Sequence, residues 1–274
     1  MKKLRVLIAC EESQAITKAF RALGHEAYSC DLLPCSGGYP EWHFQQDVLE
    51  VMNGWFDTNE VTINHNFELK LDVYEEENEF EYIDKDGVES ALIRQIGWEW
   101  DLMIAHPPCT FLAVSGARWL YNKDGTKNEE RHTNQSEALD FVRKLMDAPI
   151  KYKAIENPIS VISSEIARPT QIINPWQFGD EAQKSTCLWL FNLPTLEPTK
   201  IVGKGEFIEF IGNNGKLKRQ PKWYFDALKQ AKTPEERRTL RSKTFDGIAQ
   251  AMALQWSSHI INKTPLNLFD YATL

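Results

Sequence analysis

The residue best suited to covalent chemistry is Cys109, which follows two prolines at the end of an apolar run in "DLMIAHPPCTFLAVSG", residues 101–116. Pro107 and Pro108 lack backbone donors and fix the direction of the loop that carries the thiol. A thiolate in such a loop is a nucleophile, provided that a nearby cation or base favours its ionised form. A lone cysteine is more often a small buried apolar residue, and that interpretation stays open at this point.

An acid and an amide stand at the end of the next predicted strand, where Glu156, Asn157 and Pro158 close the run "YKAIENP". Neighbouring parallel strands present their carboxyl ends at one edge of a sheet, so we expect Cys109 and Glu156 in one cleft. A carboxyl that stays protonated, or that shares a proton with a ring nitrogen, polarises a heterocycle while a thiolate adds to it. Taken alone, Glu156 and Asn157 also suit a helix cap after the strand.

The segments that must position these residues alternate between strand and helix patterns. Helical spacing predicts one helix at 13–25, with Ser13 as a candidate cap and Gly24 as its stop, and another at 134–148. Short apolar runs rich in branched residues predict buried parallel strands at 3–10, 26–33, 101–106 and 152–157. This alternation predicts an α/β fold with a doubly wound, Rossmann-like sheet, in which ligands bind at the carboxyl ends of the strands.

Two segments interrupt this alternation. Residues 54–97 contain "NHNFELKLDVYEEENEFEYIDKDG", whose pattern predicts an inserted β-hairpin. Residues 194–239 contain "EFIEFIGNNGK" and "PKWYFDALKQA", which predict a strand, an Asn-Gly turn and a short helix. We therefore expect one principal domain, formed by 1–193 and 240–274, with 194–239 as a small separate region. The last predicted helix, in "TFDGIAQAMALQWSSHIIN", would pack on the sheet through Ile248, Ala251, Met252 and Trp256.

The charges are unevenly distributed along the chain. Its 274 residues carry a net charge of −8, yet residues 200–243 hold twelve Lys or Arg against five Asp or Glu. Residues 46–90 hold fourteen Asp or Glu against two Lys. The basic segment suits a polyanion, although charge runs are often ordinary solvated surface. Five cysteines without a Cys-x-x-Cys pair predict neither a disulfide framework nor a zinc site, and we expect no metal. With no long apolar run, we expect a cytoplasmic protein without membrane contact.

The order of the motifs resembles the cytosine-5 DNA methyltransferase family. "PPC" followed by "SG", and "ENP" further along, are similar to that family's Pro-Cys nucleophile loop and its Glu-Asn-Val acid motif. The resemblance covers about two-thirds of the chain and is closest to short, single-domain versions from bacteriophages and prophages. It implies that 1–193 with 240–274 form the catalytic and cofactor-binding domain and that 194–239 recognise DNA. The cell would be a bacterium, or a host cell infected by a phage.

The resemblance implies S-adenosylmethionine, or a modified sulfonium analogue, as the cofactor. "LIACEES" occupies the place of the family's first cofactor loop, Asp31 that of the acid on the ribose hydroxyls, and Asp47 that of the acid near the adenine amine. "TFDGIAQAMALQW" resembles the terminal helix of the cofactor pocket. The family's glycine-rich loop is replaced here by "IACEESQ", which contains no glycine. The implied cofactor-binding residues are Ala9, Cys10, Glu11, Ser13, Asp31, Asp47 and Pro107.

The reaction implied by the resemblance is transfer of a methyl group to C5 of a cytosine rotated out of DNA. Cys109 would add to C6, Glu156 would engage N3 and Asn157 would position the ring. Gln183 and Lys184 stand where the family has Gln-x-Arg-x-Arg, and the recognition region is short. The DNA contacts we expect are Arg118, Lys184, Lys216, Lys218, Arg219, Arg237 and Arg238, in a protein that acts as a monomer.

Two other functions remain open from the sequence. An enzyme of the same fold would move another group, such as a carboxymethyl, from a modified sulfonium cofactor, or would act on a free nucleotide. A non-catalytic relative would keep the fold and bind DNA without turnover, which the replaced glycine loop favours. Retention of Cys109, Glu156, Asn157, Asp31 and Asp47 argues against that second alternative.

Overall fold

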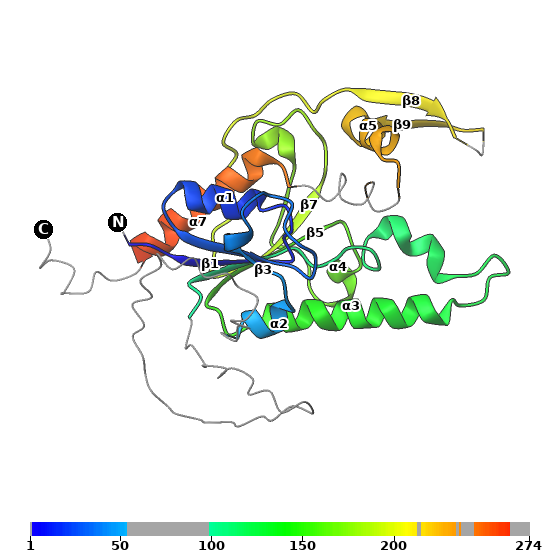
Figure 1. The fold of residues 1–274 in the computed structure, drawn as a ribbon. Helices are drawn as coiled ribbons and strands as arrows, with labels where there is room; N and C mark the ends of the chain where they lie inside the picture. Colours follow the sequence, from blue (N-terminus) through cyan, green and yellow to red (C-terminus); the bar gives the residue numbers. More distant parts are fainter. Residues whose placement is uncertain (1, 54–98, 213–214, 234–235, 237–243, 264–274) are drawn as a thin grey trace, which may run out of the picture.

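A seven-stranded, mostly parallel sheet forms the centre of the fold (Figure 1). The computed structural model describes residues 2–53, 99–212, 215–233, 236 and 244–263. The spatial order of the strands is β3-β2-β1-β4-β5-β7-β6, and the first five of these run parallel. The strands span β1 Arg5–Ala9, β2 Glu26–Cys30, β3 His43–Phe44, β4 Leu102–Ala105, β5 Tyr152–Pro158, β6 Gln171–Ile173 and β7 Thr186–Phe191.

Helices cover both faces of the sheet, and this explains the nearly continuous apolar runs of β1 and β4. One face packs against α1 (Ala15–Ala22) and α7 (Asp246–Lys263), and the other against α2 (Val48–Val51) and α3 (Glu129–Asp147). The predicted core side of the last helix is confirmed by the burial of Ile248, Ala251, Met252 and Trp256. The remaining helical turns are η1 Pro40–Trp42, η2 Val114–Leu120, α4 Ile162–Glu165, η3 Pro175–Gln177 and α5 Lys222–Gln230.

The direction of winding reverses between β1 and β4. The chain proceeds from β1 outward to β2 and β3, and then returns to place β4 and β5 on the other side of β1. In doubly wound sheets such a reversal opens a crevice at the carboxyl ends of the strands, where ligands bind. The segments after Ala9 and Ala105 therefore flank the crevice, as the α/β pattern of the sequence predicts.

The far edge of the sheet departs from the predicted parallel arrangement. β7 runs antiparallel to β5, pairing Glu156 with Leu188 and Asn157 with Cys187, and β6 adds on antiparallel to β7. Neither strand was predicted from the sequence. Because the chain reaches β7 through β6 and short turns rather than through a crossover helix, it can reverse direction at this edge.

The basic region contains a small sheet that is separate from the central one. β8 (Phe207–Ile211) and β9 (Leu217–Pro221) make an antiparallel two-stranded sheet, followed directly by α5. Figure 1 shows this unit beyond the central sheet, on the same side as the segment that joins β4 to α3. The hairpin predicted at 54–97 lies outside the described residues. No helix of the described ranges is long and apolar enough to span a membrane.

Candidate active site

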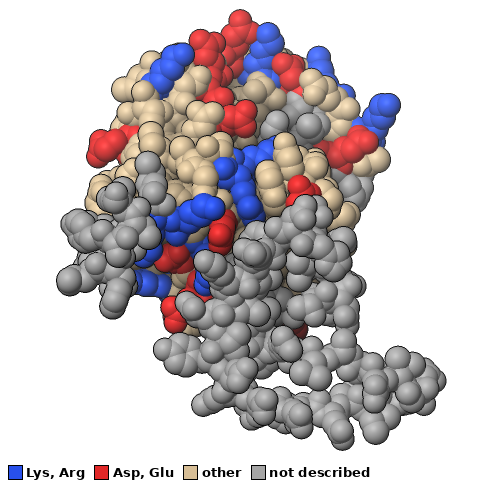
Figure 2. Space-filling view, turned by 60° about the vertical axis from the view of Figure 1, so that its left-hand side comes forward, with Lys and Arg blue, Asp and Glu red and all other residues tan. Residues whose placement is uncertain are grey.

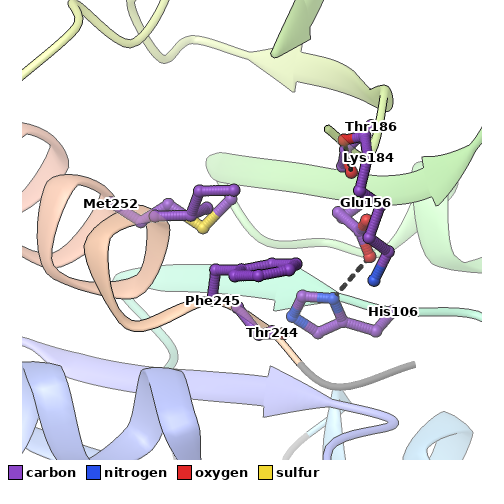
Figure 3. A pocket seen from close by; sticks show the side chains of 8 residues that line it. His106, Glu156, Lys184, Thr186, Thr244, Phe245 and Met252 are labelled. Atoms are coloured by element: carbon purple, nitrogen blue, oxygen red, sulfur yellow. Dashed lines mark hydrogen bonds and ion pairs between the residues drawn. The ribbon is translucent and has the colours of Figure 1, made fainter. Parts of the chain in front are cut away.

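The register of β4 and β5 brings His106 beside Glu156. Ala105 pairs with Ile155, so the next residue of each strand meets its counterpart at the carboxyl edge. His106 Nδ1 lies 2.9 Å from Glu156 Oε2 (Figure 3), and the two side chains are only 13% and 18% exposed. The backbone N–H of His106 also donates to the carbonyl of Ala9 at 2.9 Å. The site therefore begins at the ends of three adjacent strands.

The environment of Glu156 favours its ionised form. Burial raises the pKa of this carboxyl, but the hydrogen bond and charge of His106 lower it. Lys184 and Thr186 add smaller effects in the same direction, and the pKa ends below its ordinary value. In the protein without a bound base, its partners therefore favour the carboxylate, whereas a proton shared between Glu156 and a ring nitrogen stays a prediction. Since the carboxylate accepts, His106 Nδ1 is the donor of their hydrogen bond.

A small cavity lies against this pair. Figure 3 shows His106 and Glu156 pointing toward each other, with Phe245, just before α7, and Met252, on α7, on the other side of the cavity. The cavity measures about 10 Å³, the space of roughly one water molecule, so a heterocycle fits only when the lining side chains move apart. The structure brings Lys184 to this cavity, as part of a lining that also includes His106, Glu156, Thr186, Thr244, Phe245 and Met252.

The loop that carries Cys109 is tightly built. The carbonyl of Cys109 accepts from the N–H groups of Leu112 and Ala113 at 3.1 and 2.9 Å, which closes a turn around the half-buried thiol. From α3, Arg131 Nη2 donates to the Thr110 carbonyl at 2.9 Å, and Gln135 holds the next carbonyl at the same distance. Ala113 pairs with Ser160, which anchors the turn to the chain that leaves β5. The loop that carries the thiol is thus held by contacts with α3 and with the chain after β5.

Asn157 connects this loop to the strand of the acid. Its Nδ2 donates to the Pro107 carbonyl at 2.8 Å, and the residue is 1% exposed. Its buried Oδ1 has no hydrogen-bond partner among the described residues. Because Glu156 and Asn157 both lie inside β5, the helix-cap interpretation is wrong. The structure shows Asn157 holding the loop of Cys109, whereas contact with a ring stays a prediction.

The segment in the place of the cofactor loop adopts glycine-like conformations without glycine. Cys10 and Gln14 have φ angles of 58° and 57°, in the left-handed region that costs non-glycine residues on the order of 1–3 kcal/mol each. Gln14 begins α1 without a side-chain cap, so the expected cap at Ser13 is wrong. The acceptor comes instead from the buried carboxylate of Glu11, whose oxygens take the N–H groups of Ile16 and Thr17 at 2.7 and 3.3 Å. The loop therefore places Cys10 and Gln14 in conformations that usually favour glycine, and the Glu11 carboxylate accepts the first N–H groups of the helix.

Glu11 therefore differs from the role expected of it. Its second oxygen also accepts from the Thr17 hydroxyl at 2.7 Å, and the residue is 4% exposed. A carboxylate with both oxygens engaged at a helix N-terminus is a capping group. Burial raises the pKa of the Cys10 thiol well above its ordinary value, so this cysteine stays protonated.

The two expected cofactor acids lie near the ends of their strands. Asp31 directly follows β2, is half-buried and accepts from the Leu33 N–H at 2.9 Å. Burial raises its pKa, an effect that the backbone hydrogen bond opposes. Asp47 is exposed and caps α2 by accepting from the Leu49 N–H at 2.9 Å. Each carboxylate therefore has one oxygen engaged. Pro107 is buried two residues after the end of β4, a strand that β1 separates from β2.

The expected DNA contacts lie in different parts of the fold. Arg118 is exposed on η2, with its guanidinium 4.5 Å from the ring of Trp119. Lys184 lies at the Glu156 cavity. Lys216, Lys218 and Arg219 are exposed on or next to β9. Arg237 and Arg238 lie outside the described residues. On the face that Figure 2 shows, Lys and Arg side chains are interspersed with Asp and Glu, so charge alone does not mark a DNA surface there.

Sequence reasoning missed six residues that line the cavity: His106, Thr186, Thr244, Phe245, Ile248 and Met252. A usable signal existed for His106, because it is the last residue of the predicted strand 101–106, and Glu156 lies near the end of the next predicted strand. The others come from β7, from α7 and from the two residues before α7, and no local pattern links these segments to β4.

Within the described residues, no group of three or more His, Cys, Asp or Glu side chains is arranged to hold a metal ion. No protein-family model and no curated protein matches the chain.

Proposed function

We propose that the protein is a DNA cytosine-5 methyltransferase that works through a covalent bond between Cys109 and C6 of a flipped-out cytosine. The observation that supports this most is the double role of β5. This strand carries the acid that faces His106 and the amide that holds the Cys109 loop, 2.8 Å from the Pro107 carbonyl. A thiol nucleophile and a carboxyl that can exchange a proton with the ring, at one sheet edge, are what addition to a heterocycle requires.

The proposed reaction starts at the thiolate of Cys109. Its sulfur forms a bond to C6 as the C5–C6 double bond shifts its electrons toward N3, which takes up a proton. C5 thereby becomes an enamine carbon. After the group is transferred to C5, a solvent base removes the C5 proton, the electrons re-form the double bond, and the Cys109 sulfur leaves as thiolate. The rigid turn at Leu112 and Ala113 limits the motion of the sulfur during both steps.

The proton for N3 would come through Glu156. In the protein without a base, the carboxylate accepts from His106 Nδ1. As cytosine enters and N3 approaches the same carboxyl, Glu156 would first take up a proton from solvent, donate it to N3 during the addition, and receive it back when the thiolate is eliminated. After His106, the charge of Lys184 is the next cause that lowers the pKa of Glu156. The same charge would neutralise negative charge that develops on the ring.

The residues at the crevice fit the cofactor that the resemblance implies. S-adenosylmethionine would supply an electrophilic methyl group. Carboxylates are the usual acceptors for ribose hydroxyls and for an amine, and Asp31 and Asp47 each have an oxygen beyond the one that caps the backbone. The strained backbone at Cys10 also fits a ligand site, because such conformations gather where chains meet ligands.

The proposed function is tested by the nucleosides of DNA incubated with the protein and S-adenosylmethionine. Mass spectrometry of the digested DNA should show 5-methylcytosine. A heavier substituent on cytosine, seen only with a modified sulfonium donor, would identify the same-fold alternative. DNA that is bound but unchanged with every donor tested would identify the non-catalytic one.

Cofactor binding should depend on Asp31. Removal of its carboxylate in Asp31→Ala should weaken binding of S-adenosylhomocysteine by about tenfold to a hundredfold, the value of hydrogen bonds to a charged group. Isothermal titration calorimetry measures this directly. Asp140→Ala is the matched control, because Asp140 lies exposed on α3 in a surface ion pair and should leave the affinity unchanged. The absence of any binding by the wild type at millimolar ligand would refute the methyltransferase proposal.

DNA affinity should depend on the basic strand. Joint replacement of Lys216, Lys218 and Arg219 by glutamine should make the plot of log affinity against log salt shallower by up to about three, since each lost phosphate contact removes roughly 0.9. The effect should be equal for all DNA sequences, because phosphate contacts carry no base information. Fluorescence anisotropy at several salt concentrations measures the slope. An unchanged slope would move the path of the DNA away from β9.

A further inference from the structure

A second hollow, of about 540 Å³, lies away from the Glu156 cavity and shares no lining residue with it. It is bounded by the end of α1, the chain around the starts of β1 and β2, and η1. Its volume falls within the range of small-molecule sites. The residues that characterise it are Lys3, Lys18, Arg21, Glu26, Tyr39 and Trp42.

Its wall contains a stack of aromatic and guanidinium planes. The rings of Tyr39 and Trp42 are stacked, with centroids 4.1 Å apart and an angle of 4° between the planes. The Arg21 guanidinium lies 4.9 Å from the Trp42 centroid and 4.5 Å from that of Tyr28. Since Tyr39 covers one face of Trp42, Arg21 lies on the other. Tyr39 is 39% exposed and forms the open end of the stack.

The stack is held in place before any ligand arrives. The side chain of Gln14, which is fully buried, donates to the Tyr39 carbonyl at 2.7 Å and accepts from the Tyr39 N–H at 3.1 Å. Gly37 packs so closely on Gln14 that a Cβ there would lie 2.5 Å from the Gln14 Cβ. These bonds fix the backbone of Tyr39, and the stack on Trp42 orients its ring, so another plane that stacks on the ring costs little further ordering.

The hollow carries an excess of positive charge. Lys3 and Lys18 are exposed at its rim, and Arg21 has a buried Nη2 without a hydrogen-bond partner among the described residues. Glu26 is the acid of its described lining, and it already lies 3.8 Å from the Nε of Arg5. The carbonyls of Phe20 and Arg21 at the end of α1 accept backbone N–H groups, so they are already hydrogen-bonded without the lysines.

We infer that this hollow binds a nucleotide, with the base stacked on Tyr39 and the phosphate between Lys3 and Lys18. A fixed aromatic plane beside unbalanced cations matches the two parts of a nucleotide, a flat π-system and an anion. The nucleotide comes either free from solution or as one unit of a DNA strand. This inference does not rest on the proposed methyltransferase activity, because no residue of that site is involved.

Calorimetry with thymidine 5′-monophosphate, inorganic phosphate and a ten-nucleotide oligothymidylate tests this inference. Thymine is chosen because it is neither the adenine of the expected cofactor nor the cytosine of the expected substrate. Tyr39→Ala should weaken nucleotide binding by about tenfold, whereas Tyr39→Phe should preserve it, because stacking needs only the ring. The pair Lys3→Gln and Lys18→Gln should also weaken it by about tenfold, and the equally charged pair Lys144→Gln and Lys151→Gln should not.

Each outcome decides the inference. If the substitutions weaken binding of the monophosphate, the ligand of the hollow is a free nucleotide. If they weaken binding of the oligothymidylate alone, the ligand is a DNA strand. If neither ligand responds to these substitutions, or if inorganic phosphate binds as tightly as the nucleotide, the inference is overturned. Should Tyr39→Ala lower the unfolding midpoint too far for measurement, the lysine pair, which is exposed, still decides it.

Discussion

DNA that contains 5-fluorocytosine will form a covalent adduct with the wild-type protein in the presence of S-adenosylmethionine, and Cys109→Ser will form none. Fluorine cannot leave C5 as a proton, so elimination stalls and the Cys109 sulfur remains bonded to C6. The adduct should survive denaturation and appear as a slower band in a denaturing gel and as the summed mass in mass spectrometry. Turnover on ordinary DNA should fall by at least about a thousandfold in the same variant, because a hydroxyl is a far weaker nucleophile near neutral pH.

The chain offers a matched control for this substitution. Cys35 is also half-buried and lies outside any disulfide among the described residues, so Cys35→Ser should trap DNA as the wild type does. Cofactor affinity of Cys109→Ser should stay within a few-fold of wild type, which separates loss of the nucleophile from loss of the fold. An adduct that forms equally well without the Cys109 thiol, or cytosine modification without trapping under any condition, would make this cysteine structural and the assignment of the whole site wrong.

Glu156→Gln will slow group transfer by about a hundredfold to ten-thousandfold, the usual contribution of a positioned acid. An amide cannot pass a proton to N3 while the ring accepts the Cys109 sulfur. Single-turnover rates with excess enzyme measure this step without product release. Glu165→Gln is the matched control, because Glu165 is exposed on the short helix α4 and should leave the rate unchanged. A Glu156→Gln rate within a few-fold of wild type would remove the acid from the mechanism.

The same carboxyl should appear in the acid stability of the protein. Its pKa is lower in the folded state than its ordinary value, so its ionised form contributes stability above the unfolded pKa of about 4.3. That contribution is lost as pH falls through the lowered folded value. The difference in free energy of unfolding between wild type and Glu156→Gln should therefore be constant near neutral pH and shrink under acid, as urea titrations at several pH values would show.

Much of the sheet follows from local patterns in the chain. The apolar runs that became β1, β4 and β5 are continuous because both faces of each strand are buried, and such runs are visible without a structure. Their carboxyl ends identified the sheet edge at which Glu156 lies and after which the Cys109 loop begins. A strand and the short helix of the basic region followed in the same way, because each is a signal of a few residues. The predicted Asn-Gly turn falls partly outside the described residues.

The partners of these residues were decided only by the tertiary structure. His106 meets Glu156 across fifty positions of chain because the register of β4 and β5 aligns them, and Asn157 reaches Pro107 by the same register. Met252 enters the site because α7 crosses the face of the sheet. Periodicity records which face of an element is buried, but not which other element buries it. Contacts between distant segments therefore needed the assembled fold, since each depends on strand order, direction and register rather than on a local pattern.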